Sequence, residues 1–171
     1  MKKLLILILF LMITGCQENK VIIPKQSIRF RVVANSNSFY DQEIKQKVKN
    51  EIQNEMIQDL EEIEEIENAR IKIKEKIGSY TDLVKNTLDK NNIKTDFKIN
   101  YGNNYFPEKE YKGVTYQEGE YESLVITLGD GNGDNWWCVL FPPLCLLETE
   151  EDNKDEIEYK FFIKEIIDKY F

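Results

Sequence analysis

The residues best suited to chemistry or binding lie together in the run Asn135–Cys145, NWWCVLFPPLC. This run places two adjacent tryptophans, Trp136 and Trp137, in an almost wholly apolar setting. Pro142-Pro143 remove two backbone donors and fix two φ angles, which disfavours both a core strand and a helix. We therefore expect apolar surface held in a rigid, non-repetitive shape, as in an organised binding face or a stapled corner.

Two cysteines flank the proline pair. Cys138 and Cys145 are separated by six residues, and an exported chain can keep a disulfide between such cysteines. Closing so short a loop would stabilise the fold by only about 2.5 kcal/mol, so the bond would serve mainly to fix the shape of the turn. The alternative is that both cysteines are buried free thiols that pack as small apolar residues.

Histidine is absent from the 171 residues. The chain therefore lacks the commonest general base, the commonest zinc ligand and the usual partner of a serine or cysteine nucleophile. Catalysis by carboxylates alone is the remaining option, but the 31 acidic residues offer no pair that stands out. We expect a protein that is not an enzyme and that uses no cofactor.

The segment Gly129–Asp134, GDGNGD, leads into the tryptophans. It is not followed by the Lys-Ser/Thr pair of a phosphate-binding loop, and prolines follow where that loop would open a helix. Asp130, Asn132 and Asp134 match the opening of a calcium loop, but the closing bidentate glutamate would fall on Phe141, so any Ca²⁺ site is weak. The better explanation is that the glycines permit the positive φ angles of turns that aim the tryptophans.

The N-terminal 15 residues have the layout of a signal peptide, with two lysines before a short apolar run. Small residues before Cys16 resemble a bacterial lipobox, which predicts cleavage after residue 15 and acylation of the Cys16 thiol. An ordinary secretory signal with a chance cysteine is the alternative. We expect residues 16–26 to form the lipidated N-terminus and a tether, and residues 27–171 to form a single domain.

The charge of the chain limits its partners. Removal of the signal peptide takes the net charge from −8 to about −10, because two lysines are lost. An acidic chain is a poor ligand for nucleic acid and gains nothing from anionic lipid head groups. Attachment to a membrane would therefore come from the lipid anchor at Cys16.

Alternation of apolar and other residues predicts strands. In residues 28–33 the pattern puts Arg29 and Arg31 on the face away from the core. Further strands are expected at Phe97–Tyr101, Val114–Tyr116 and Leu124–Leu128, with a polar, aromatic loop from Gly102 to Lys112.

Apolar residues at helical spacing predict two helices joined as a hairpin. The first is capped at Ser38, and the break falls in Glu61–Glu67, where clustered carboxylates oppose the helix dipole. A final helix from Glu156 has one apolar face for the core; alternatively, Phe161 and Phe171 extend that face toward a partner or the lipid surface. The fold class is therefore α+β: a small antiparallel or mixed sheet of about four strands packed against a helical hairpin and a C-terminal helix.

Several segments together resemble those of one family. They are IRFRVVANSNS at 28–38, YFPEKEY at 105–111, the stretch from Gly119 through NWWCVLFPPLC, and KFF at 160–162. On these segments the chain resembles the stage II sporulation protein R family of spore-forming Firmicutes. The resemblance covers almost the whole of the expected mature chain.

The resemblance implies a signalling role in sporulation. Such a protein is made in the forespore and exported to the outer face of the forespore membrane, in the space between the two cells, either lipoprotein-anchored or secreted. There it activates a membrane-embedded aspartic protease of the mother cell, SpoIIGA, which processes the precursor of the mother-cell sigma factor E. This chain would be the activating ligand and not the catalyst.

A rigid aromatic cluster can anchor a protein interface because ordering it costs little entropy. The expected partner contacts are Trp136, Trp137, Phe141 and Pro142, with Asn35, Tyr105 and Phe106 nearby. The alternative is that these side chains form the core. Two other functions stay open: a lipoprotein that binds a cell-wall sugar or peptide through Trp136 and Trp137, and a hydrolase that uses a close pair of buried carboxylates.

Overall fold

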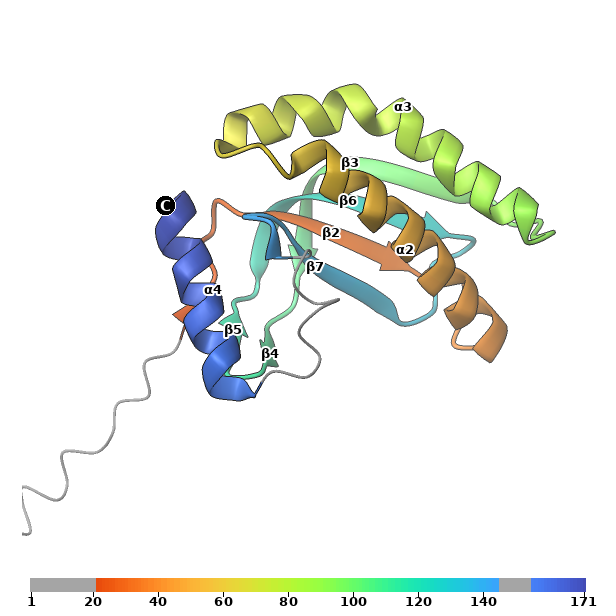
Figure 1. The fold of residues 1–171 in the computed structure, drawn as a ribbon. Coiled ribbons are helices and arrows are strands. Elements are labelled where there is room, and N and C mark those ends of the chain that lie inside the picture. The colour runs from red at the N-terminus through yellow and green to blue at the C-terminus, as the bar shows by residue number, and fades with distance from the viewer. Residues whose placement is uncertain (1–20, 145–154) are drawn as a thin grey trace, which may run out of the picture.

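The computed structural model describes residues 21–144 and 155–171. They form an α+β fold with a four-stranded sheet, a three-stranded sheet, a helical hairpin and a C-terminal helix (Figure 1). The predicted fold class is therefore confirmed. The signal peptide, Cys16 and Cys145 lie outside the described residues, so the predictions that concern them stay predictions.

The larger sheet is mixed. Its strands, in spatial order, are β3 (Phe97–Phe106), β6 (Gly119–Leu128), β2 (Ile28–Val33) and β7 (Asn135–Phe141). The central pair β2 and β6 is parallel, whereas β3 and β7 run antiparallel to their neighbours. A parallel pair needs a long crossover connection, and most of that connection here is the helical hairpin.

Strand β7 corrects one expectation from the sequence. Seven residues of the run that the prolines were expected to keep out of a strand do form one, and it pairs with β2 from Asn135 to Phe141. The prediction was wrong because Pro142 comes after the last paired residue, Phe141, opposite Ile28. The prolines therefore remove no donor from the ladder, and they stop the strand at the edge of the sheet.

The hairpin consists of α2 (Phe39–Leu60) and α3 (Ile66–Lys90), and both helices cover one face of the larger sheet (Figure 1). The side chain of Ser38 accepts a hydrogen bond from the amide of Asp41 at 3.1 Å, which confirms the predicted cap. The chain leaves the helix within the glutamate-rich segment, as the clustered charges predict.

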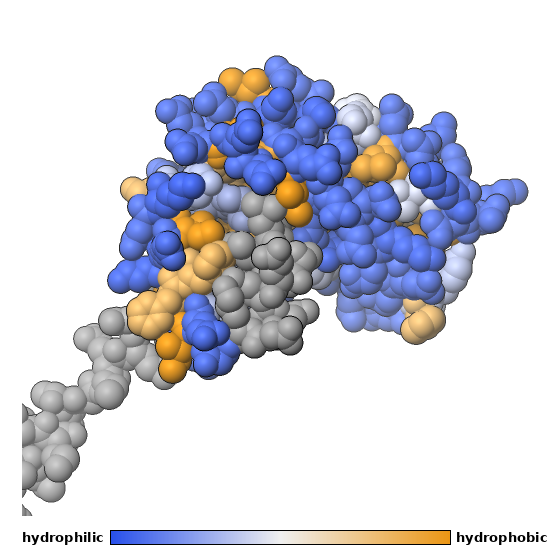
Figure 2. Space-filling view, in the orientation of Figure 1, coloured by the Kyte–Doolittle hydropathy of each residue, from blue (hydrophilic) through white to orange (hydrophobic). Residues whose placement is uncertain are grey.

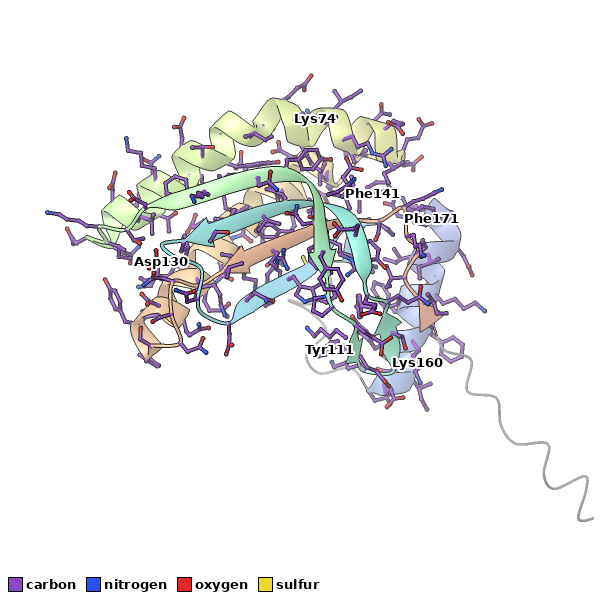
Figure 3. The ribbon with its side chains drawn as sticks, turned by 180° about the vertical axis from the view of Figure 1, so that it is seen from behind. Lys74, Tyr111, Asp130, Phe141, Lys160 and Phe171 are labelled. Atoms are coloured by element: carbon purple, nitrogen blue, oxygen red, sulfur yellow. The ribbon has the colours of Figure 1, made fainter. Side chains whose placement is uncertain are left out.

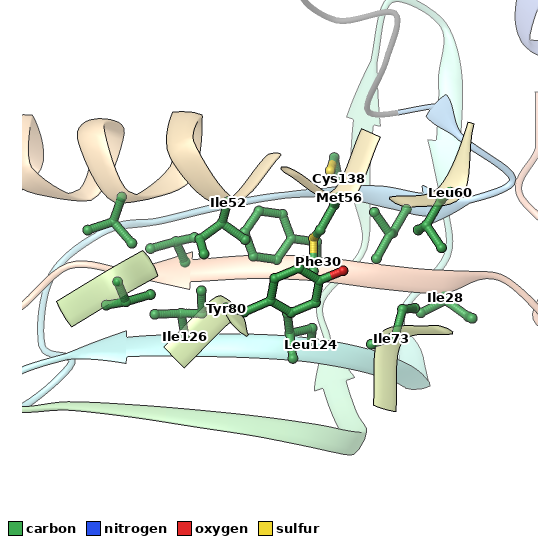
Figure 4. Packing of buried hydrophobic residues seen from close by; sticks show 14 of the residues in the cluster. Ile28, Phe30, Ile52, Met56, Leu60, Ile73, Tyr80, Leu124, Ile126 and Cys138 are labelled. Carbon is green, nitrogen blue, oxygen red and sulfur yellow. The ribbon is translucent and has the colours of Figure 1, made fainter. Parts of the chain in front are cut away.

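The main core lies between this hairpin and the sheet (Figure 4). Its buried members come from α2, α3, β2, β6 and β7, and include Ile52, Met56, Ile73, Tyr80, Phe30, Leu124, Ile126 and Cys138. Because apolar residues at helical spacing meet alternate residues of the strands, one contiguous core results.

A smaller sheet and the last helix form a second layer at one end of the larger sheet. The sheet has the order β1 (Val21–Ile22), β5 (Val114–Tyr116) and β4 (Lys109–Tyr111), and α4 (Glu156–Tyr170) packs beside it. A second buried cluster holds these parts together: Ile23, Phe106, Val114, Tyr116, Tyr121, Trp137, Val139, Leu144, Tyr159 and Ile163.

This second layer differs from two sequence expectations. The tether expected for residues 16–26 includes β1 and the fully buried Ile23, so ordered structure begins before residue 27. The loop expected from Gly102 to Lys112 is mostly strand, because β3 runs on to Phe106 and β4 follows it. Within residues 21–144 and 155–171, no helix is both long and apolar enough to cross a bilayer.

Candidate functional site

The two tryptophans of β7 point to opposite faces of the larger sheet, because neighbouring side chains of a strand alternate. Trp136 is partly buried against the main core and makes an edge-to-face contact with Phe30, with ring centroids 5.8 Å apart. The ammonium of Lys49 lies 4.5 Å from the Trp136 ring. Trp136 thus covers the edge of the helix-side core.

Trp137 lies in the second cluster and is only 7% exposed. Its ring meets those of Phe106 and Tyr116 edge-on, with centroids 5.4 Å and 5.3 Å away. The Lys109 ammonium lies 5.2 Å from the ring. Trp137 therefore joins β7 to β3 and to the smaller sheet.

Arg29 lies beside this second cluster. It faces away from the main core, as predicted, but it is fully buried beneath the second layer. Its guanidinium lies 3.4 Å from the centre of the Tyr121 ring and 4.8 Å from that of Trp137. Rings carried by β3, β6 and β7 of the same sheet therefore enclose the guanidinium.

The hydrogen bonding of Arg29 is incomplete. One Nη donates to the carbonyl of Gln117 at 3.4 Å, and Nε and the other Nη have no hydrogen-bond partner. Burial lowers the pKa of Arg29 to about 10, so the side chain remains charged at neutral pH. The π faces of the surrounding rings supply favourable electrostatics for a cation that has lost its water.

Arg31 lies on the same face of β2, nearer to solvent. Its guanidinium is 4.4 Å from the Phe106 ring, and Nη1 donates to the carbonyl of Tyr105 at 3.2 Å. Burial lowers its pKa from the usual value. Together the two arginines and the rings form a cation–aromatic cluster, which we define as Arg29, Arg31, Phe106, Tyr121 and Trp137.

The structure separates the other predicted contact residues. Phe106 and Phe141 are buried at 0% and 1% exposure, and Pro142 is buried as well. Tyr105 is 52% exposed, and its hydroxyl donates to Glu118 at 2.9 Å. Of the predicted aromatic contacts, Tyr105 is the one that is well exposed.

Asn35 lies at the opposite end of the sheet from Tyr105. Its side-chain oxygen accepts from the amide of Asp130 at 3.0 Å, and its Nδ2 donates to Asp41 at 3.0 Å. Asp130 is at one end of the molecule and Tyr111 is at the other (Figure 3). Asn35 thus ties the end of β2 to the start of α2 and to the glycine-rich turn, and we call this junction the Asn35 corner. It does not extend the aromatic surface near Tyr105.

Two exposed aromatic residues that were not predicted from the sequence as contacts lie beside the Asn35 corner. Phe39 and Tyr40, the first residues of α2, are 86% and 54% exposed. Phe39 falls off the apolar stripe that Ile44 and Val48 begin, which is the signal that could have identified it as a surface residue.

The glycine-rich turn is used for shape. Gly129 and Gly131 have φ angles of 55° and 68°, as the explanation from turn geometry requires. The Nδ2 of Asn37 donates a hydrogen bond to Oδ1 of Asp134 at 3.3 Å, and the backbone carbonyl of Asp134 accepts one from Lys45 at 3.1 Å. Within the described ranges, no three His, Cys, Asp or Glu side chains are grouped so that they could hold a metal ion.

Two further features bear on a small ligand. A hollow of about 10 Å³ beside Trp137 has room for one water and not for a sugar. A hollow of about 500 Å³ lies between the end of α3 and the start of β3, lined by Leu88, Ile93 and Phe97 among others, far along the chain from the tryptophans.

The buried polar side chains in the described parts of the chain include no Asp or Glu, so the carboxylate pair required by a hydrolase is not found there.

Comparison with known proteins assigns the family. The family model for stage II sporulation protein R matches residues 24–151, which include the whole larger sheet and the helical hairpin. The chain therefore belongs to this family of sporulation proteins.

Among curated proteins, the chain is similar to Stage II sporulation protein R of Bacillus subtilis (strain 168). The two are 39% identical over 132 residues, which cover 77% of this chain and 59% of that protein. The chain thus matches little more than half the length of its relative. No solved structure matches the chain.

Proposed function

We propose that this chain is an exported signalling protein of sporulation that activates a membrane-embedded aspartic protease of the SpoIIGA type. Activation leads that protease to process the precursor of the mother-cell sigma factor E. The observation that carries the proposal is membership of the stage II sporulation protein R family over residues 24–151. In this proposal the protein acts at the outer face of the forespore membrane, with Cys16 acylated.

The geometry supports action by contact. The domain presents a fold held by two buried clusters, and its described part offers neither a metal cluster nor a buried carboxylate. Because Trp137, Phe106 and Phe141 are buried in the fold, we assign them to its support. The exposed aromatic residues then form two separate candidates for contact with the protease: Tyr105 at one end of the sheet, and Phe39 with Tyr40 at the Asn35 corner at the other.

Co-expression tests this proposal directly. The full chain is produced with the candidate protease and the sigma-factor precursor in a host that exports proteins, and precursor cleavage is followed. We expect cleavage that requires the chain, and weaker cleavage when residues 1–16 are removed and the protein stays inside the cell. Cleavage at the same rate without the chain, or none with the full chain exported, would refute the proposal.

Two neighbouring residues provide a matched pair for the contact. Tyr105→Ala removes an exposed ring and is expected to reduce cleavage without unfolding the domain, whereas Phe106→Ala is expected to act through lost stability. The stability of each purified variant separates the two effects. Normal cleavage with Tyr105→Ala would move the contact to the Asn35 corner.

The alternative of a cell-wall ligand gains no support from the tryptophans. Sugar stacking by the pair would need both rings on one surface, but they lie on opposite faces of the sheet, and the hollow beside Trp137 is too small for a sugar.

A further inference from the structure

Helix α4 carries an apolar stripe that faces away from the domain. Ile157, Phe161 and Phe171 are 66%, 71% and 51% exposed. At 100° per residue Ile157 and Phe161 lie about 40° apart on the helix surface, opposite the buried Tyr159 and Ile163, and Phe171 is the residue that follows the end of the helix. Apolar colour is visible along α4 in the space-filling view (Figure 2). We call Ile157, Phe161 and Phe171 the α4 stripe.

The stripe lies beside the point where the described chain begins. β1 contacts α4 and pairs in parallel with β5, which places Val21 opposite Val114. The neighbouring Gly113 lies so close to Lys160 that a side chain at position 113 would collide with it. The start of β1 is therefore next to the part of α4 that carries Ile157 and Phe161.

Chain length then limits how far the stripe can lie from a lipid anchor. Cys16 precedes Val21 by five positions. Five residues of fully extended chain span at most about 18 Å. An acylated Cys16 would therefore hold the α4 end of the domain close to the membrane surface, whatever the conformation between them.

We propose that the α4 stripe rests on the lipid bilayer and sets the orientation of the domain on the membrane. This inference rests on the proposed acylation of Cys16. Apolar side chains of a surface helix insert about 5–10 Å into the interfacial region. The exposed flank of α4 mixes lysines with glutamates, and the whole chain is acidic, so contact comes from the apolar side chains and weakens as anionic lipid is added.

This orientation has a consequence for the partner. α2 begins at the end of the molecule away from α4 (Figure 1). With the stripe on the membrane, the Asn35 corner with Phe39 and Tyr40 points away from the lipid, toward whatever faces this membrane. The stripe would thus present the corner to the opposite side of the intermembrane space.

A tethered form of the protein tests the inference without the protease. The mature chain beginning at Cys16 is coupled through that thiol to a maleimide lipid in phosphatidylcholine vesicles, so the tether does not depend on acylation in a cell. Phe161→Trp and Phe39→Trp each add one exposed indole to the same background of Trp136 and Trp137. Vesicles with bromines on the acyl chains quench indoles that reach the lipid.

We expect bromine to lower the emission of the indole added at position 161 by roughly twofold or more, because that indole would lie within the interfacial region of the bilayer. The emission of the indole added at position 39 should not change. A Cys16→Ser chain detects coupling through any other thiol. Equal quenching at both positions, or none at either, overturns the inference. Absence of quenching at 161 combined with loss of precursor cleavage in Phe161→Ser would assign the stripe to a protein partner instead and would also overturn it.

Discussion

At the scale of single residues, burial separates positions that look alike in the sequence. Trp136 and Trp137 are neighbours, yet one covers the edge of the main core and the other is enclosed by rings and by the buried Arg29. A cation that keeps its charge inside a protein normally needs an acidic partner. Arg29 instead has three aromatic rings within 5.0 Å of its guanidinium carbon.

The first prediction concerns the two tryptophans. Trp137→Ala leaves a cavity in a buried aromatic cluster and is expected to lower the free energy of unfolding by about 3–5 kcal/mol. This loss is a large part of the total free energy of unfolding of a typical domain. Trp136→Ala is expected to cost less, because that ring is only partly buried. Urea unfolding followed by circular dichroism measures both.

Trp137→Phe serves as the control for this prediction, because it keeps a ring in the cluster and should recover much of the lost stability. If Trp137→Ala kept normal stability but failed to activate precursor cleavage, Trp137 would be a contact residue after all.

At the scale of elements, the helical hairpin is fastened by polar groups as well as by its apolar faces. The hydroxyl of Tyr80 in α3 donates to Asp59 in α2 at 2.9 Å, and Lys76 lies 2.7 Å from the other oxygen of that carboxylate. Tyr80 is fully buried, and its burial and the bond to Asp59 raise its pKa above the usual value near 10.

The second prediction follows from this pKa. Above pH 10 Tyr80 keeps its proton in the folded protein but loses the proton in the unfolded chain. The folded state therefore binds more protons than the unfolded state, and the free energy of unfolding falls as pH rises. One such group accounts for up to about 1.4 kcal/mol per pH unit. Tyr80→Phe should therefore be less stable at pH 7, by roughly 1.5–3 kcal/mol for a hydrogen bond to a charged group, but should lose less stability between pH 10 and 11.

Unfolding by urea across this pH range measures the difference between the two proteins. Tyr101, whose bond to Glu122 and burial also raise its pKa, and Arg29, whose pKa is lowered, are present in both proteins and cancel. Identical pH slopes for the two proteins would show that Tyr80 is not held protonated by the fold.

At the scale of the whole molecule, one sheet serves two cores. β7 contributes Cys138, Leu140 and Phe141 to the main core and Trp137 and Val139 to the second cluster. Loss of either cluster would leave apolar side chains of the same strand exposed. The two layers should therefore unfold together.

The third prediction is that unfolding is a single transition. Tryptophan emission and far-ultraviolet circular dichroism, followed in one urea titration, should give the same midpoint. Ile163→Ala, a change confined to the second cluster, should lower both midpoints equally, by an amount that corresponds to about 2–5 kcal/mol. Two separate midpoints would show that the layer of α4 and the smaller sheet unfolds independently.

The sequence by itself determined the local elements. Helical spacing from Ile44 to Leu88, the cap at Ser38 and the glutamate-rich break predicted the hairpin, and alternation predicted β2, because these signals act between residues a few positions apart. The family was also recognisable from short segments, since their residues are characteristic without any knowledge of their neighbours in space.

Only the tertiary structure decided which faces are buried. Alternation along β2 put Arg29 on the face away from the main core, but Phe106, Tyr121 and Trp137, which lie far from it in the sequence, enclose its guanidinium and leave it fully buried. The second cluster also encloses Trp137, while Tyr105 stays exposed. Burial depends on packing between distant segments, and no local pattern records which segments will meet.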